Sequence, residues 1–186
     1  MPVEPLSQSP ARVVESLLYL VHKLGKPTTI HEVLKLRYFA DKVHLSRYGS
    51  LASGDTYVAM KFGPVGSTAF NLLKAARGER SQFIEPQVIE AADRALNVDA
   101  ANDEVKALRQ PRGEMLSPAD VECMDAAVAK FGALSFEERT KLSHDAAWSA
   151  ARNEAIRKKV AREAMPLRSI VATLQNAEEV IEYLED

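Results

Sequence analysis

The spacing of apolar and polar residues predicts that most of the chain is helical. Between residues 10 and 24 the apolar positions recur every three or four residues, which is the period of one helix face, and Gly25 follows them. The same period returns after Thr29, where Thr29 and Glu32 have the spacing of a capping box, and it ends at Gly49. We expect one helix in each stretch.

A short strand and a sharp corner are predicted next. Tyr57–Met60 has the pattern of a strand, and the next helix runs from about residue 67 to 77. Between them lies the sequence Gly63-Pro64-Val65-Gly66. Glycine permits positive φ, whereas proline fixes its own φ and keeps the residue before it out of the helical region. We therefore expect residues 63–66 to end the strand and start the helix.

Residues 79–113 have a different character. The stretches 94–100 and 103–111 are typical of two short strands around a polar turn, although residues 87–95 equally fit a helical turn. Helical order then returns with Ser117 as a cap and with a predicted buried stripe of Val121, Met124, Val128 and Phe131. Ser135 and Glu138 form another capping-box pattern.

The C-terminal tail is basic at first and acidic at its end. Pro166 is expected to break it into two helices. The apolar residues after Pro166 form small stripes that need cover, at Ile170, Val171, Leu174, Val180, Ile181 and Leu184. Packing on the body is the expected arrangement, and the alternatives are contact with a partner or presentation of a complex to a protease.

These patterns predict a mostly α (α+β) fold. We expect a single helical domain with a small antiparallel β element over residues 1–155, followed by a C-terminal helical extension over 156–186. Composition adds few constraints, because the net charge of −2 suggests neither nucleic acid nor an anionic membrane as a partner. The single cysteine excludes an internal disulfide, and no apolar run approaches membrane-spanning length. We therefore expect a cytoplasmic protein with no membrane partner, and we do not expect nucleic acid as its partner.

One helix face carries most of the candidate chemistry. Arg37, Asp41, His44 and Tyr48 are four, three and four residues apart, which places them on one side of a helix. Asp41 and His44 could act as an acid–base pair or supply two metal ligands, and a third ligand such as His144 would then be needed. Simpler alternatives are an Arg37–Asp41 ion pair, or an internal pairing of Asp41 and His44 that braces the helix against the strand at 57–60.

The other candidates favour structural roles. His144 and Asp145 precede Trp148, the only tryptophan, which indicates either a pocket or a buried His–Asp hydrogen bond under the indole. Cys123 is expected to fill the core. The amides after Val65 could hold an anion at a helix N-terminus. No enzyme signature or cofactor motif is evident, so we expect neither catalysis nor a cofactor. A winged-helix-like DNA-binding regulator is the alternative function.

Residues 36–74 resemble the signature of the Panacea-domain family, the SocA-like and GepA-like proteins first labelled phage-associated. The matching helix carries Tyr38, Phe39, Ala40, Asp41 and His44 and ends in Tyr48-Gly49. A polar turn, the strand elements Tyr57, Ala59 and Met60, and the sequence Gly63-Pro64-Val65 follow. Leu142, Ser143, His144 and Trp148 resemble a second family element, and the likeness spans roughly residues 12–153.

The resemblance implies a bacterial antitoxin that neutralises a cognate protein toxin by direct binding. In the SocA branch the antitoxin also delivers its toxin to the ClpXP protease, so ClpX is a second implied partner. We expect the toxin contact at Arg37, Tyr38, Asp41, His44 and Tyr48, because arginine and tyrosine are frequent at interface centres. The other motif residues are expected to be structural, namely Gly49, Tyr57, Met60, Gly63, Pro64, Val65, His144 and Trp148.

Overall fold

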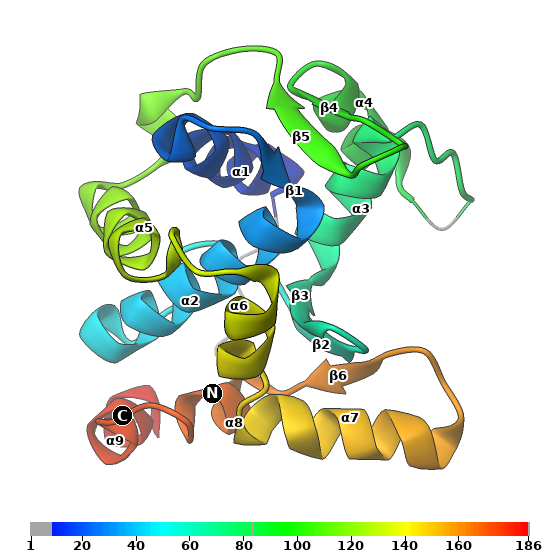
Figure 1. Cartoon of the computed structure of the whole chain (residues 1–186). Coiled ribbons are helices and arrows are strands. Elements are labelled where there is room, and N and C mark those ends of the chain that lie inside the picture. The colour runs from blue at the N-terminus through cyan, green and yellow to red at the C-terminus, as the bar shows by residue number, and fades with distance from the viewer. Residues whose placement is uncertain (1–8, 83, 186) are drawn as a thin grey trace.

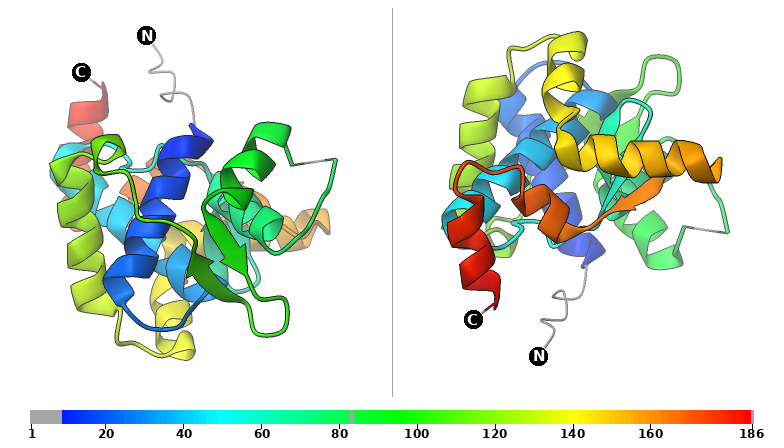
Figure 2. Two further views of the ribbon diagram at one scale, coloured as in Figure 1. Left: turned by 90° about the horizontal axis from the view of Figure 1, so that it is seen from above. Right: turned by 90° about the horizontal axis from the view of Figure 1, so that it is seen from below.

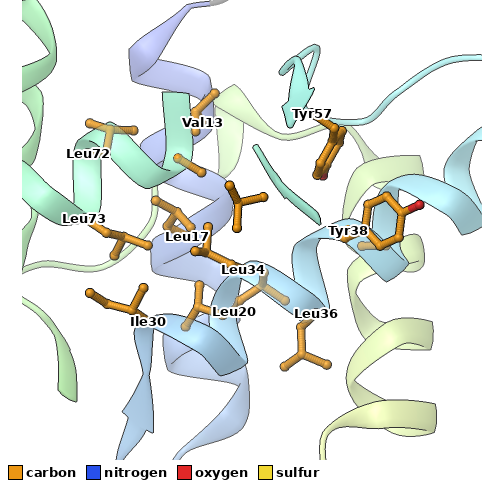
Figure 3. Close-up of a cluster of buried hydrophobic side chains, with 14 of the residues drawn as sticks. Val13, Leu17, Leu20, Ile30, Leu34, Leu36, Tyr38, Tyr57, Leu72 and Leu73 are labelled. Atoms are coloured by element: carbon orange, nitrogen blue, oxygen red, sulfur yellow. The ribbon is translucent and has the colours of Figure 1, made fainter. Parts of the chain in front are cut away.

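The computed structural model describes residues 9–82 and 84–185 and confirms a mostly helical α+β fold. Helix α2 (Ile30–Tyr48) occupies the middle of the molecule, and α1 (Pro10–Leu24), α5 (Pro118–Phe131) and α6 (Phe136–Ser143) pack around it (Figure 1). Both α1 and α2 end as predicted at glycines in the left-handed conformation, Gly25 and Gly49. The apolar core lies where α1, α2 and α3 (Ser67–Ala76) meet, as the labelled leucines of Figure 3 show.

The first antiparallel sheet joins distant parts of the chain. Its strand order is β1 (Thr28–Thr29), β5 (Glu104–Ala107) and β4 (Leu96–Val98). The two strands predicted in residues 94–111 are confirmed. Residues 87–95, for which two structures were open, form most of helix α4 (Pro86–Asp93) before β4 begins.

The second sheet contains the Gly-Pro-Val sequence and corrects one expectation. Strand β2 (Tyr57–Met60) turns back through Lys61 and Phe62 into β3 (Gly63–Gly66), with Met60 opposite Gly63. Residues 63–66 are therefore a strand of a tight hairpin, not a corner that leaves the extended conformation. Pro64 is compatible with this role because β3 lies at the sheet edge, where a missing N–H is tolerated. Gly63 has a φ of 109°, which is the positive value that the sequence suggested.

The C-terminal part packs against the body. After α7 (Ala146–Lys158), strand β6 (Glu163–Met165) pairs with the free edge of β2. Helices α8 (Leu167–Val171) and α9 (Ala177–Glu185) follow Pro166, as predicted, and both contact α2. Ile170, Val171 and Val180 are buried. The expected boundary at residue 155 falls inside α7, and β6 was not predicted.

Helix α5 buries a slightly different face from the one predicted. A short 3-10 helix, η1 (Gly113–Met115), leads into it, and Ser117 and Asp120 form a capping box. Met124 is buried as expected, but Val121, Val128 and Phe131 are only half-buried. Cys123 and Ala127 take the deepest positions, and Cys123 fills the core as predicted. The capping box predicted at Ser135 and Glu138 opens α6.

Candidate functional site

The polar face of α2 points into the protein. Arg37, Tyr38, Asp41 and His44 are all buried, whereas Tyr48 is 42% exposed. A partner can therefore reach Tyr48, but the other four side chains are covered by this chain's own residues. The partner-binding assignment of the five residues stays a prediction, and their internal contacts define the site described below.

Arg37 pairs with Asp55, not with Asp41. Its Nη1 lies 2.8 Å from Asp55 Oδ2, and its Nε donates to Ser16 Oγ at 3.0 Å. Burial opposes the charge, but Asp55, Tyr57 and Asp41 together outweigh it and raise the pKa of Arg37. The Arg37–Asp41 ion pair that the sequence suggested on a half-exposed face is therefore replaced by a fully buried Arg37–Asp55 pair.

Asp55 also caps helix α3. Its Oδ1 accepts from the amide of Thr68 at 2.9 Å, and its Oδ2 accepts from the amide of Ala69 at 3.0 Å. The anion expected at this helix N-terminus is thus supplied from within the chain. Gly66 is required here because a Cβ atom would lie 2.5 Å from Asp55 Oδ2 and 2.8 Å from Arg37 Nη1.

Asp41 braces α2 against the hairpin. Tyr57 donates its hydroxyl to Asp41 Oδ2 at 2.6 Å, and Ser53 donates both its hydroxyl and its amide to the same carboxylate. Burial, with Asp41 adding to it, raises the pKa of Tyr57 well above its usual value. Asp41 thus braces α2 against the strand, as one of the alternatives had it, but its partners are Ser53 and Tyr57 and not His44.

His44 lies beside Asp120 of α5. Its Nδ1 is 2.7 Å from the Ser50 carbonyl oxygen, and its Nε2 is 3.4 Å from Asp120 Oδ1. Since both neighbours are acceptors, the doubly protonated ring satisfies both, and these contacts raise the pKa of His44 although burial opposes the charge. Arg12 also donates to Asp120, at 2.8 Å. His44 therefore links α2 to α5.

A second cluster lies under the hairpin. The Trp148 indole donates to the Met60 carbonyl at 2.9 Å, and Lys35 Nζ donates to the Pro64 carbonyl at 2.9 Å. The rings of His144 and Trp148 stack with centroids 3.5 Å apart. The two family-like segments around residues 57–65 and 142–148 therefore meet at this hairpin. Val65, between Pro64 and Gly66, is buried opposite Val58.

Asp145 has a different role from the one predicted. It caps α7 by accepting from the Trp148 amide at 3.0 Å, and it also accepts from the Tyr38 hydroxyl at 2.7 Å and from Lys42 at 2.9 Å. The expected His144–Asp145 hydrogen bond is therefore wrong, because capping turns the carboxylate toward the helix and α2. The predicted packing of His144 against the indole is confirmed.

The basic side chains under the hairpin have lowered pKa values. Burial lowers the pKa of Lys35 to about 7. Burial, together with the nearby charges of Lys35 and Arg139, lowers the pKa of His31 to about 3, and burial followed by Lys35 lowers that of His144. Sequence reasoning missed Lys35, because a lysine between two leucines carries no signal of burial, and it gave Asp55 no role beyond a place in the polar turn of the family signature.

Asp41, His44 and His144 occupy separate environments, so the arrangement offers no shared metal centre. Across residues 9–82 and 84–185, no group of three or more His, Cys, Asp or Glu side chains is placed to hold a metal ion. In the same part of the chain no helix has the length and hydropathy needed to cross a membrane. The basic stretch after Arg152 is partly neutralised, since Glu154 pairs with Arg157 and Lys158.

The contacts described above define a helical scaffold in which a hairpin is locked to a central helix by buried polar side chains. The family model for "Antitoxin SocA-like, Panacea domain" matches residues 33–149, from α2 into α7. The chain belongs to this antitoxin-like family. No curated protein and no solved structure shows a significant match to it.

Proposed function

We propose that the chain neutralises a cognate protein toxin by binding to it directly, without catalysing a reaction. The family match over residues 33–149 carries this proposal. The internal contacts support it, since Arg37, Asp41 and His44 are each engaged by residues of the same chain. Side chains held in this way brace a scaffold and are not available to a substrate.

A braced scaffold suits inhibition by binding. Asp55 ties α2 to α3, Asp41 ties α2 to β2, and His44 ties α2 to α5. A surface built on elements that are already fixed loses little conformational entropy when a partner docks. The buried motif residues would then contribute to affinity by holding the outer faces of these elements in place.

Co-expression with each adjacent reading frame tests the proposal. We expect one neighbour to arrest growth when produced alone, and we expect this chain to restore growth and to co-purify with the neighbour as a stable complex. Co-expression of each neighbour with an empty vector in place of this chain serves as the negative control. Harmless neighbours, or rescue without a complex, would contradict the proposal.

Delivery of the toxin to ClpXP is a finer form of the same proposal. It predicts that purified ClpXP degrades the toxin faster when this chain is present, whereas simple inhibition predicts a stable toxin in the complex. A salt-dependent mobility shift with the promoter DNA of the chain's own gene would favour the DNA-binding alternative instead.

A further inference from the structure

A surface groove separates the C-terminal end of α2 from α9. It has a volume of about 380 Å³, and its lining includes Arg47, Tyr48, Gly49, Asn176, Glu179 and Tyr183. Figure 2 shows α9, in red, beside the cyan end of α2. The family match ends at residue 149, so one wall of the groove belongs to the matched domain and the other does not.

Helix α9, which forms the wall outside the family match, is held in a defined position. Asn176 and Ser46 exchange two hydrogen bonds, of 2.8 and 2.9 Å, and Val180 is buried against the body. Any side chain at Gly49 would place its Cβ 2.4 Å from the ring of Tyr183, so the ring lies directly on the end of α2. The groove is therefore built before a partner arrives.

Its rim combines aromatic rings with unbalanced acidic charge. Tyr183 is 66% exposed and Tyr48 is 42% exposed. Arg47 pairs with Glu122 and Arg168 pairs with Glu185. Within the described residues, Glu179, which lines the groove, has no cationic partner, and neither do Glu178 and Glu182 on the same helix. Exposed tyrosines beside unpaired glutamates complement a surface with apolar anchors and positive charges.

We propose that this groove binds a basic segment of the toxin, in which lysine or arginine side chains flank an apolar residue. The inference rests on the proposed function, because it assigns a docking surface for the same partner. The apolar residue would lie between Tyr48 and Tyr183, and the flanking cations would face the glutamates of α9. The groove thereby gives the tail of the chain a part in the choice of partner.

The test is a binding titration of the purified adjacent gene product with two charge-reversed variants. Glu179→Lys/Glu182→Lys changes the rim, since Glu179 lines the groove and Glu182 is exposed one turn further along α9, whereas Glu114→Lys/Glu137→Lys makes the same change in net charge on η1 and α6, where both glutamates are exposed. We expect the rim variant to bind about tenfold more weakly or worse and the control to bind within about twofold of wild type. Tyr183→Ala should also lose about tenfold, and binding by the wild type should weaken as salt increases. Circular dichroism of each variant checks that α9 and the body are still folded.

The outcomes separate the inference from the function on which it rests. If the wild type binds and the rim variants bind equally well, the groove is not the docking surface, but inhibition by binding stands. If the wild type does not bind any adjacent product, both proposals fail. If the rim variants only turn a self-associated chain into a monomer, the occupant is a second copy and the inference is overturned.

Discussion

Lys35 and Arg37 lie two residues apart on α2, both are buried, and their surroundings are electrostatically opposite. Arg37 faces the carboxylate of Asp55, which raises its pKa. Lys35 donates to the carbonyl of Pro64 and has no carboxylate partner among the described residues, and burial lowers its pKa to about 7. The difference shows that a buried cation keeps its charge when a carboxylate compensates for the lost water, and that a single backbone carbonyl does not suffice.

The largest effect on stability is expected when the carboxylate that compensates a buried cation is removed. Asp55→Asn would leave Arg37 buried without its counter-charge and weaken the cap of α3, so we expect a loss of about 3–5 kcal/mol in the free energy of unfolding. Urea denaturation measures it. Asp93→Asn, which breaks an exposed pair with Arg80, is the control and should change stability by less than about 1 kcal/mol. If Asp55→Asn lost as little stability as Asp93→Asn, other groups would be sufficient partners for Arg37.

Gly63→Val tests the hairpin above Lys35. Gly63 has a φ of 109°, and a Cβ there would lie 2.6 Å from Ser143 Oγ and 2.8 Å from Lys35 Cε. We expect a loss of about 1–3 kcal/mol, measured by thermal unfolding. The matched control is Gly113→Ala, since nothing lies within 4 Å of a Cβ at Gly113. A Gly63→Val protein that melts with the wild type would contradict the strained conformation of β3.

Lys35→Met removes the buried cation that has no carboxylate partner, and its effect on folding stability should depend on pH. The unfolded chain holds the Lys35 proton up to a pH near 10.5, and the folded chain releases it near pH 7. Between these values unfolding takes up a proton, so this group makes stability rise with pH, by at most about 1.4 kcal/mol per pH unit. Below pH 7 folded Lys35 carries its proton, so the full free-energy cost of burying its charge lowers the stability of the protein. Lys35→Met should therefore stabilise the protein more at pH 6 than at pH 9.

Urea midpoints of wild type and variant across this pH range measure the effect. Lys141→Met, at an exposed position of α6, should show no such trend. A difference between Lys35→Met and wild type that is constant with pH would mean that folded Lys35 keeps its proton throughout.

The smallest effect concerns the other hydrogen bond to the hairpin. Trp148→Phe removes the donor to the Met60 carbonyl while it keeps an aromatic ring next to His144. We expect a loss of about 1 kcal/mol, because one buried hydrogen bond is removed. Tyr48→Phe, which removes an exposed bond to Glu122, should cost less. If the two substitutions cost the same, Trp148 holds the hairpin by packing alone.

The sequence revealed the elements whose signals are local. Helix ends at Gly25 and Gly49, the cap at Ser135 and the strand at 57–60 all depend on neighbouring residues, and all were predicted. Strand β6 is too short to show a pattern of its own and exists because the edge of β2 is free to pair with it. No window of sequence contains that information.

Contacts between separate elements also explain why sequence reasoning misjudged the polar face of α2. The polar face of α2 looked like a surface because charged residues usually face water, yet α2 is surrounded by other elements. Asp120, which compensates His44, comes from α5, and Asp55, which compensates Arg37, comes from the turn before β2. Their pairing with α2 could be found only once the fold had brought them together.

The pairing of β6 with β2 has a consequence for the order of synthesis. Residues 163–165 are made about 100 residues after the hairpin, and at about 5–20 residues per second the ribosome takes about 5–20 s to reach them. During that interval the nascent chain carries a strand edge that nothing in its own sequence yet covers. Helix α9 is made later still, so a partner that needs the groove at α2 can engage only a nearly finished chain.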